Sequence, residues 1–205
     1  MSDESLGTIF IVDDTEVIRD SLRWLFESRG FIAEVFESAA AFLAAHDEEP
    51  AGCVILDVRM PGMTGPELHD EIQRRGWQLP ALFLTGHGDV PMAVEALKKG
   101  ALDFVEKPFN DNDLVDRVAR CLRLDAERRR TAAGRQSVAA RRSQLTTREQ
   151  EVMRLVLAGK LNKQIADELR IAMRTVEVHR ARVLAKMGVR SAVELAQVVS
   201  LKDLG

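Results

Sequence analysis

Acidic, hydroxyl and basic side chains follow several short apolar runs of this sequence, each at the point where a strand would end. They are Asp13 and Asp14 after residues 8–12, Asp57 after 53–56, Thr85 with Gly86 after 81–84, and Phe104 with Lys107 within and after 102–105. Sites in open α/β sheets form at the carboxyl ends of strands. Three carboxylates, a hydroxyl and an ammonium at one sheet edge are typical of a divalent-cation site beside a phosphoryl-binding group. This chemistry predicts a phosphorylation switch rather than a turnover enzyme.

The crowding of Asp13, Asp14 and Asp57 predicts a bound cation. Like charges in one crevice repel each other unless a metal ion neutralises them. Mg²⁺ takes oxygen ligands and keeps several waters, so one or two carboxylates and a backbone carbonyl are sufficient. Two adjacent aspartates after a strand more often form a solvated loop or a helix cap, but Asp57 and Lys107 at matching strand ends favour the metal. We therefore expect Mg²⁺ as the cofactor.

Asp57 is the expected phosphoacceptor because it stands alone at the end of the middle strand, and an aspartate carboxylate can attack phosphorus to form an acyl phosphate. Lys107 is the expected counter-ion of the phosphoryl group, and a cis peptide bond to Pro108 would aim it inward. Thr85 is placed to donate a hydrogen bond to a phosphoryl oxygen, and Gly86 leaves space beside it. Phe104 is either a core residue, which periodicity favours, or a switch residue.

Two further positions, Arg59 and His87, lie two residues beyond Asp57 and Thr85. Side chains there could control the access of water to a phosphoryl group, or could simply be solvated loop residues. Both interpretations stay open.

The first half of the chain alternates apolar runs with amphipathic patterns, which predicts an α/β fold. The expected strands are 8–12, 32–36, 53–56, 81–84 and 102–105, and the expected helices are 15–29, 39–45, 66–75, 90–98 and 111–124. The strands are apolar throughout, as strands buried on both faces of a doubly wound parallel sheet are. Helical patterns alone follow, over 147–158, 162–169, 173–187 and 191–200, which predicts an all-α domain of four helices.

Charge is divided unevenly along the chain. Residues 1–124 hold 12 Lys+Arg and 23 Asp+Glu, a net charge of −11, whereas residues 125–205 hold 17 and 9, a net charge of +8. We expect an acidic domain over 1–124, an Arg-rich helical linker over 125–144 that continues the preceding helix for a turn or two, and a basic domain over 145–205. The basic domain would meet a polyanion, most simply DNA, although charge spread for solubility is the plainer alternative. No apolar run is long enough to cross a membrane, and the expected location is the cytoplasm.

Helix 173–187 has the features of a helix that reads DNA. Its apolar stripe is Val176, Val183, Leu184 and Met187, and the opposite face carries small side chains and one arginine, which suit entry into a major groove. The expected DNA contacts are Lys163, Arg174, Thr175, Glu177, Val178, His179, Ala181, Arg182 and Lys186. Arg180 lies nearer the apolar stripe, so we expect a structural partner for it, such as Glu149. A routine amphipathic helix is the alternative.

Both halves resemble known families. Ile-Val-Asp13-Asp14, Leu-Asp57-Val-Arg-Met-Pro-Gly, Thr85-Gly-His-Gly-Asp and Phe104-Val-Glu-Lys107-Pro resemble a two-component receiver domain of the FixJ type, over residues 8 to about 122. Leu145-Thr-Thr-Arg-Glu, Asn162-Lys-Gln-Ile-Ala, Arg174-Thr-Val-Glu-Val-His-Arg and Lys186-Met-Gly resemble a LuxR-type helix-turn-helix domain. Leu161 and Ala172 depart from that pattern, where serine is common.

The resemblance implies a flavodoxin-like receiver and a transcription regulator. Asp57 would take phosphate from a sensor histidine kinase, and Mg²⁺ would be held by Asp14, Asp57 and the carbonyl of Arg59, with Asp13 acting through water. Thr85 and Phe104 would then move. The phosphorylated chain would dimerise through helix 90–98, strand 102–105 and helix 111–124, and would bind promoter DNA beside RNA polymerase.

Two rival functions remain open. One is a small Mg²⁺-dependent phosphatase, but such enzymes have a second acid two residues after the nucleophile, where this chain has Arg59. The other is a DNA-binding protein with a vestigial receiver, which the presence of every site residue disfavours.

Overall fold

The computed structural model describes residues 7–86 and 90–199, without the side chains of residues 90, 91 and 93. The chain divides into two compact units, Met1–Arg129 and Arg130–Gly205. The helix α5 begins in the first unit and ends in the second.

The first unit is built on a five-stranded parallel sheet of order β2-β1-β3-β4-β5. Its strands are β1 (Thr8–Val12), β2 (Ile32–Phe36), β3 (Gly52–Asp57), β4 (Ala81–Thr85) and β5 (Asp103–Glu106). This order changes direction beside β1, because the chain first crosses to β2 and then returns to β3 on the other side. A strand-order reversal of this kind creates a crevice at the carboxyl edge of the sheet. The predicted doubly wound, flavodoxin-like fold is confirmed.

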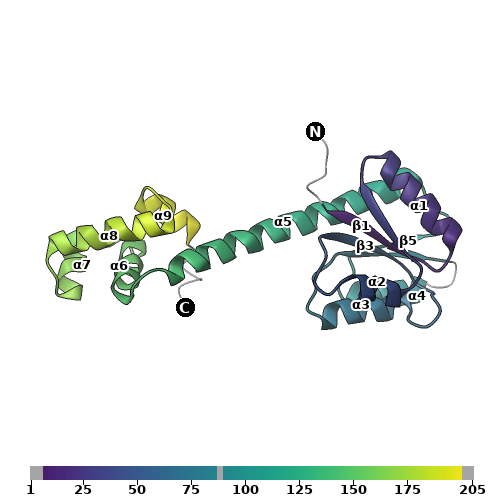
Figure 1. Ribbon diagram of the computed structural model, residues 1–205, viewed down its shortest axis with the longest axis horizontal. Helices are drawn as coiled ribbons and strands as arrows, with labels where there is room; N and C mark the ends of the chain where they lie inside the picture. Colours follow the sequence, from purple (N-terminus) through teal and green to yellow (C-terminus); the bar gives the residue numbers. More distant parts are fainter. Residues whose placement is uncertain (1–6, 87–89, 200–205) are drawn as a thin grey trace. The chain divides into compact units, whose positions relative to one another are not determined.

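Helices cover both faces of this sheet. They are α1 (Glu16–Ser28), α2 (Ala39–Ala45), α3 (Gly65–Arg74), α4 (Val90–Lys98) and the first part of α5 (Asp111–Ser143). Figure 1 shows α1 and α5 on one face, and α2, α3 and α4 on the other. Connections between parallel strands are right-handed, which is why the helices after β1 and β3 lie on opposite faces.

Each face of the sheet has its own apolar core, because successive strand residues point to opposite faces. Phe10, Val54 and Phe83 belong to the core under α2, α3 and α4. Ile11 and Ile55 belong to the core under α1 and α5. Burial of a side chain of this size stabilises the fold by about 1.5–3 kcal/mol. The two cores fix the positions of the strand ends that carry the site.

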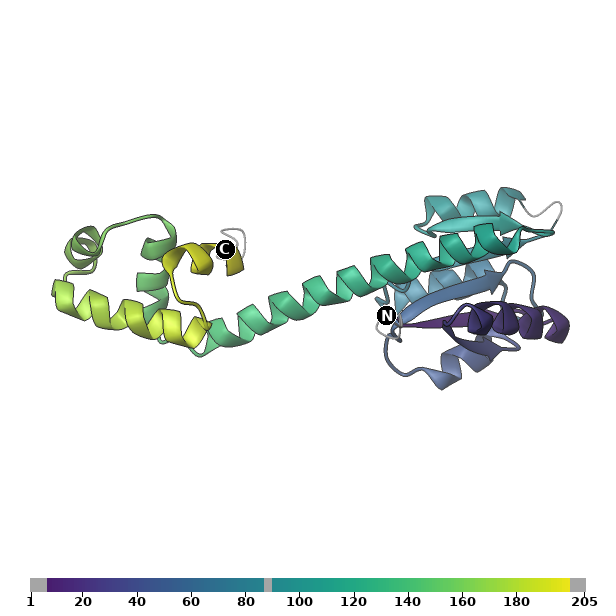
Figure 2. The same ribbon diagram turned by 90° about the horizontal axis from the view of Figure 1, so that it is seen from above.

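The helix α5 is longer than the sequence predicted. The apolar periodicity ends near residue 124, and we expected a linker that continues the helix for only a turn or two beyond it. In the structure α5 runs uninterrupted to Ser143 (Figure 2). Residues 125–143 contain no proline and are mostly Ala, Arg, Glu and Gln, which are strong helix formers. Propensity alone therefore supports the helix where no core face guides it.

A buried carboxylate fastens α5 to the sheet. Asp125 is fully buried, and its Oδ2 accepts a hydrogen bond of 2.9 Å from the backbone N–H of Gly52 at the start of β3. Arg128 and Arg129 neutralise this carboxylate, each at 2.7 Å. Arg128 also reaches Glu49 at 2.5 Å. A buried charge needs such partners, because an unpaired one would carry a large desolvation penalty.

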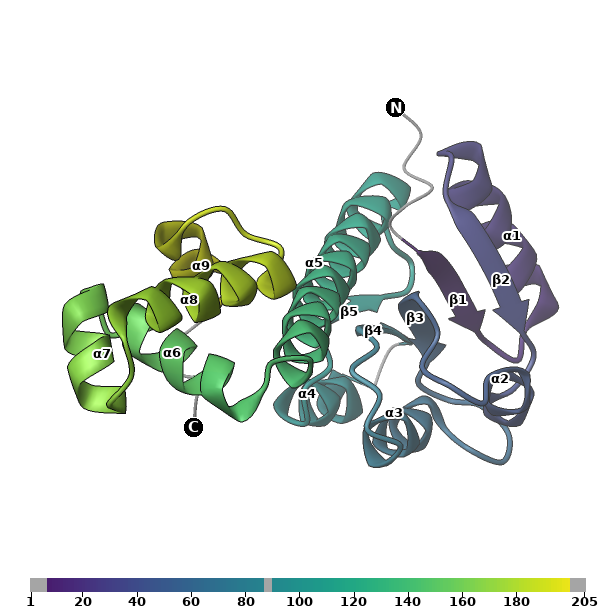
Figure 3. The same cartoon turned by 60° about the vertical axis from the view of Figure 1, so that its left-hand side comes forward.

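The second unit packs short helices around one apolar core (Figure 3). The helices are α6 (Thr147–Leu157), α7 (Asn162–Leu169), α8 (Met173–Met187) and α9 (Ala192–Val198). Thr146 and Glu149 form a capping box at the start of α6, and Ser191 caps α9. The core includes Val152, Ile165 and Val183. The predicted all-α domain is confirmed.

Among the described residues, none of the helices combines the length and the apolar composition that crossing a membrane requires.

Candidate functional site

The carboxyl edge of the sheet brings together side chains from three strands. Asp13 follows β1, Asp57 ends β3 and Lys107 follows β5. Val12 pairs with Leu56, and Asp57 pairs with Leu84, so the ends of β1, β3 and β4 are level with one another. The register of the parallel sheet therefore places residues that are far apart in the sequence in one crevice.

The ammonium of Lys107 lies between two carboxylates. Its Nζ is 2.6 Å from Asp57 Oδ1 and 2.9 Å from Asp13 Oδ2. The Lys107–Pro108 peptide bond is cis. Asp13 is buried, whereas the side chain of Asp57 is 13% exposed. Asp57 is thus the acid of the pair that a phosphoryl donor could reach from solvent.

Backbone groups hold both carboxylates in place. The N–H of Arg59 donates to Asp57 Oδ2 at 2.8 Å, and the N–H of Thr15 donates to Asp13 Oδ1 at 2.9 Å. The Arg19 guanidinium donates to the carbonyl oxygen of Asp13 at 2.8 Å. Each acid is therefore held by a partner on its own loop and by Lys107 across the sheet, which fixes its orientation before any ligand binds.

Burial and charge act in opposite directions on the titration of this pair. Burial raises the pKa of Asp57, and the nearby Asp13 raises it further, against the lowering effect of Lys107. Burial lowers the pKa of Lys107, but its hydrogen bonds and charge interactions with Asp57 and Asp13 outweigh burial and raise it. Lys107 therefore stays protonated at neutral pH, as a counter-ion for added negative charge must.

The third predicted acid, Asp14, stands apart. Its side chain is exposed and makes no hydrogen bond or ion pair with the described residues. Over residues 7–86 and 90–199, no three His, Cys, Asp or Glu side chains are close enough together to form a metal-binding group. The two acids that the structure brings together are Asp13 and Asp57, which both contact the ammonium of Lys107. Two carboxylates that converge on one cation are oxygen donors of the kind that Mg²⁺ takes.

Thr85 and Phe104 lie beside the crevice in different environments. Thr85 is fully buried, and its hydroxyl donates to the carbonyl oxygen of Gly86 at 3.2 Å. Phe104 is half-buried and packs against the core that lies under α2, α3 and α4. This half-buried position agrees with either role that the sequence left open for Phe104. His87 lies outside the described residues.

One residue that the sequence analysis did not identify supports the site. Gly65 begins α3, and a Cβ there would lie 2.2 Å from the carbonyl oxygen of Asp57. No other residue type fits so close to the strand end, because that contact is far below van der Waals distance. The signal was present in the sequence: Thr64 and Glu67 flank Gly65 as a capping box, which marks a helix start beside the site.

The second candidate site is the exposed face of α8. Val176, Val183 and Met187 are buried in the core of the second unit, as predicted, and Leu184 packs against it. The predicted DNA contacts that lie exposed on α7 and α8 are Lys163, Arg174, Thr175, Glu177, Val178, Ala181 and Arg182, whereas His179 is half-buried. The structure therefore supports the predicted division of α8 into a buried and an outward face.

One predicted side-chain partner on α8 needs correction. Arg180 donates to Asn162 Oδ1 at 3.0 Å, so its partner is on α7 and is not Glu149. The partner of Glu149 is Lys186. The Nζ of Lys186 lies 2.6 Å from Glu149 Oε2 and also donates to the carbonyl of Gln144. This ion pair and the capping hydrogen bonds lower the pKa of Glu149 to about 2. Lys186, a predicted DNA contact, therefore also has a partner inside the unit, and its side chain is 35% exposed.

Comparison with known protein families identifies both units. Residues 9–119 match the response regulator receiver domain, and residues 143–199 match the bacterial regulatory proteins of the luxR family. The first match spans more than half of the chain.

Individual proteins resemble the whole chain. It is 54% identical to the C4-dicarboxylate transport transcriptional regulatory protein DctR of Rhodobacter capsulatus, over 93% of this chain and 98% of that protein. It is 44% identical to the transcriptional regulatory protein FixJ of Bradyrhizobium diazoefficiens, over 94% of each. Among solved structures, the response regulator StyR matches with a TM-score of 0.86 and 43% identity, over 93% of this chain and 96% of that one. Full-length FixJ from B. japonicum matches with a TM-score of 0.60 and 44% identity, over 94% and 96%.

Proposed function

Because this chain belongs to the two-component response regulators, those that join a receiver domain to a LuxR-type helix-turn-helix domain, we propose that Asp57 is the phosphoacceptor that controls its DNA binding. The protein is a transcription regulator and not a turnover enzyme, and its partners are a sensor kinase and DNA. The observation that carries the assignment of Asp57 is the contact of Lys107 with both Asp57 and Asp13. Asp57 is the more exposed of these two acids.

Phosphorylation would proceed by attack of the Asp57 carboxylate on the phosphorus of a phosphohistidine. A new O–P bond forms, the P–N bond breaks, and the imidazole leaves with the electron pair. Lys107, already 2.6 Å from Asp57 Oδ1, is placed to neutralise the added phosphoryl oxygens. The buried hydroxyl of Thr85 would turn from the carbonyl of Gly86 to a phosphoryl oxygen, and Gly86 leaves the space for it.

The cofactor we assign is Mg²⁺, held by the carboxylates of Asp14 and Asp57 and the carbonyl of Arg59, with Asp13 acting through water. When bound, the ion supplies positive charge that stabilises the phosphoryl oxygens. Asp14 is free in the described structure to take this role, and its exposure allows it to turn inward. Hydrolysis of the acyl phosphate within the same site would return the chain to its resting state, with the side chain of Arg59 flanking the path of water.

The kinase would dock on α1, beside the site. A groove of about 660 Å³ is lined by Ile18, Trp24, Leu25, Phe109 and Lys107. Trp24 is 72% exposed, which is unusual for a tryptophan without a partner. An apolar groove that ends at Lys107 fits an amphipathic helix that delivers a phosphohistidine to Asp57.

Phosphorylation would then promote a homodimer through α4, β5 and α5, with Phe104 as the residue that responds on β5. A dimer presents two copies of α8, which suits the two half-sites of a promoter. The DNA contacts we propose on α7 and α8 are Lys163, Arg174, Thr175, Glu177, Val178, His179, Ala181, Arg182 and Lys186. We place the protein in the cytoplasm together with this DNA, and contact with RNA polymerase would follow from promoter binding.

The test uses beryllofluoride, which mimics a phosphoryl group on an aspartate. We expect the treated wild-type chain to shift to a dimer in gel filtration and to bind duplex DNA more tightly, and Asp57→Asn to do neither. The control Asp47→Asn changes an exposed aspartate in the loop after α2 that has no partner among the described residues, and should respond like wild type. A full response by Asp57→Asn would contradict the assignment.

A further inference from the structure

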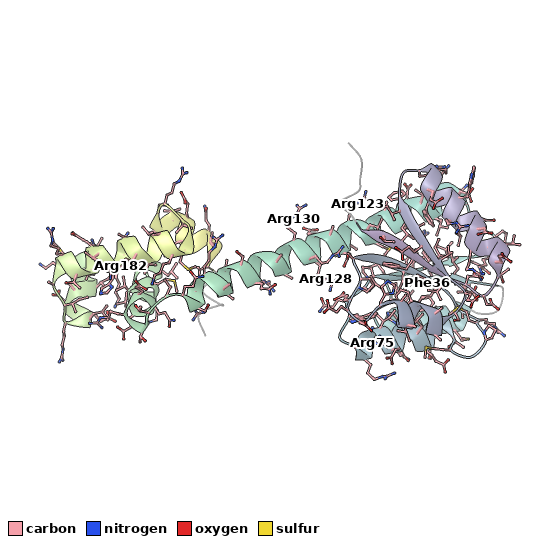
Figure 4. All side chains as sticks on the ribbon, viewed as in Figure 1. Phe36, Arg75, Arg123, Arg128, Arg130 and Arg182 are labelled. Carbon is pink, nitrogen blue, oxygen red and sulfur yellow. The ribbon has the colours of Figure 1, made fainter. Side chains whose placement is uncertain are left out.

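We infer that Val178 and Arg182 determine the base sequence that this chain reads, with Val178 against the 5-methyl group of a thymine and Arg182 bound to the O6 and N7 of a guanine. The inference rests on the proposed binding of α8 in the major groove and goes beyond it by naming the bases. Both residues lie in the middle of α8, and Figure 4 labels Arg182 there.

The outward face of α8 is unusually apolar. Val178 is 45% exposed, and it is followed on the same face by Ala181, Arg182 and Ala185, all exposed. Residues four apart in a helix lie one above the other, so Val178 and Arg182 form a single row. Val178 is absent from the apolar core of this unit and from the half-buried residues that pack against it. Its side chain therefore has no structural role in the described unit.

The charged residues of α8 separate into engaged and free groups. Arg180 is bound to Asn162, and Lys186 is bound to Glu149. Arg174 and Arg182, by contrast, make no hydrogen bond or ion pair with any residue in the described ranges. Arg174 lies in the first turn, beside the N-terminal N–H groups that bind phosphates, and Arg182 lies at the centre of the exposed row. Arg182 is therefore the free guanidinium that faces base edges.

The chemistry of the row selects particular bases. A guanidinium pairs with two acceptors at once, and guanine presents the adjacent acceptors N7 and O6 in the major groove. A valine side chain has no polar atom, so its favourable contact is with the thymine methyl, the apolar group of that groove. The small side chains of Ala181 and Ala185 let the helix approach closely on either side.

The spacing of the row fixes how far apart these bases lie. Four residues of α-helix rise about 6 Å, and successive bases of one strand are about 3.4 Å apart. The thymine and the guanine should therefore be in adjacent base pairs or be separated by a single base pair. A half-site that contains both within such a distance is the expected ligand.

The experiment begins with the full-length chain, treated with beryllofluoride, and a random library of DNA duplexes, from which the bound sequences are selected. In the selected duplex each thymine is then replaced in turn by uracil, which lacks the methyl group, and each guanine by 7-deazaguanine, which lacks N7. For the wild-type chain we expect one uracil substitution to weaken binding about fourfold, the effect of one buried methyl group. We expect one 7-deazaguanine substitution to weaken it about tenfold.

The variants assign these two effects. Val178→Ala should bind the thymine and uracil duplexes equally but still bind the 7-deazaguanine duplex more weakly. Arg182→Ala should bind the guanine and 7-deazaguanine duplexes equally but still bind the uracil duplex more weakly. The matched controls are Val193→Ala, which changes a valine that is 68% exposed on α9, and Arg154→Ala on α6, and both should keep both effects. The inference is overturned if Val178→Ala keeps the full uracil penalty or Arg182→Ala keeps the full 7-deazaguanine penalty. If the wild-type chain binds no duplex, the proposed DNA binding falls and this inference falls with it.

Discussion

The carboxylate of Asp125 accepts a hydrogen bond of 2.9 Å from the backbone N–H of Gly52, and neither group is reached by solvent. Gly52 begins β3, and the same strand ends at Asp57. One strand thus carries the anchor of α5 at its start and the proposed phosphoacceptor at its end. Because α5 is also the helix that continues into the second unit, this anchor sets where the helix leaves the sheet.

Replacement of Asp125 by alanine should loosen α5. The change leaves the Gly52 N–H without an acceptor and removes the partner of Arg128 and Arg129, a loss of about 2–4 kcal/mol. Hydrogen exchange of the Gly52 amide and of the α5 amides should become faster by the factor that this loss of stability implies. Asp116→Ala, at an exposed position of the same helix, should change stability by less than about 0.5 kcal/mol. Equal exchange in wild type and Asp125→Ala would show that the anchor is not needed.

The ion pair of Glu149 with Lys186 predicts a pH dependence of the second unit. The pKa of Glu149 is lowered in the folded chain from 4.5 to about 2, first by the hydrogen bond from Lys186 and then by the N–H of Thr146. A lowered folded pKa means that the contribution to stability is complete above about pH 4.5 and is lost as the pH falls toward 2. Glu149→Gln should therefore be less stable than wild type at pH 7, by about 1–3 kcal/mol.

Urea unfolding followed at pH 7 and pH 3 checks this sign. The difference between wild type and Glu149→Gln should shrink at pH 3, because the wild-type carboxylate has begun to lose its advantage. Glu168→Gln, which removes the exposed partner of Lys160, serves as the control and should show only a small difference at either pH. A difference between wild type and Glu149→Gln that grows in acid would contradict the linkage.

Gly65 should tolerate no side chain. Gly65→Ala places a Cβ against the Asp57 carbonyl, which must shift the strand end that carries the proposed phosphoacceptor. We expect loss of stability of about 1–3 kcal/mol and slower labelling by acetyl phosphate. Gly134→Ala is the matched control, because that glycine lies in α5 with open space around it, and the change should stabilise by about 0.5–1 kcal/mol. Normal labelling of Gly65→Ala would mean that the contact can relax.

Trp24→Ala should separate two routes to phosphorylation. If the kinase docks on the groove beside α1, loss of this exposed central aromatic side chain should slow phosphoryl transfer about 30-fold. The donor is a kinase that phosphorylates the wild-type chain. Labelling by acetyl phosphate, which needs no docking surface, should be unchanged. If Trp24→Ala takes phosphate from the kinase as fast as the wild-type chain does, the kinase docks elsewhere on the receiver.

The sequence predicted the strands to within one residue at each end, and also the second-unit helices, because each depends on local pattern. Apolar runs of strand length and helical periodicity are both visible without a structure. What it missed depends on contacts across the chain. Asp125 meets Gly52 across 73 positions, and Lys186 meets Glu149 across 37. Such pairings are set by tertiary packing.

The length of α5 was missed for a different reason. Its second half buries little, so the apolar signal ended at about residue 124 although the helix continues to Ser143. In that stretch only intrinsic propensity marks the helix, which is a weak signal compared with periodicity. The proposal that Asp57 is the acceptor, by contrast, rests only on the placement of a lone acid at the end of the middle strand.

The most direct test of the central claim locates the phosphoryl group. The chain is labelled with acetyl phosphate and Mg²⁺, then reduced with borohydride, which converts an aspartyl phosphate to homoserine, and its peptides are sequenced by mass spectrometry. We predict homoserine at position 57 in the wild-type chain and no label in Asp57→Asn. Homoserine at Asp13 or Asp14 with an unchanged Asp57, or full labelling of Asp57→Asn, would contradict the account.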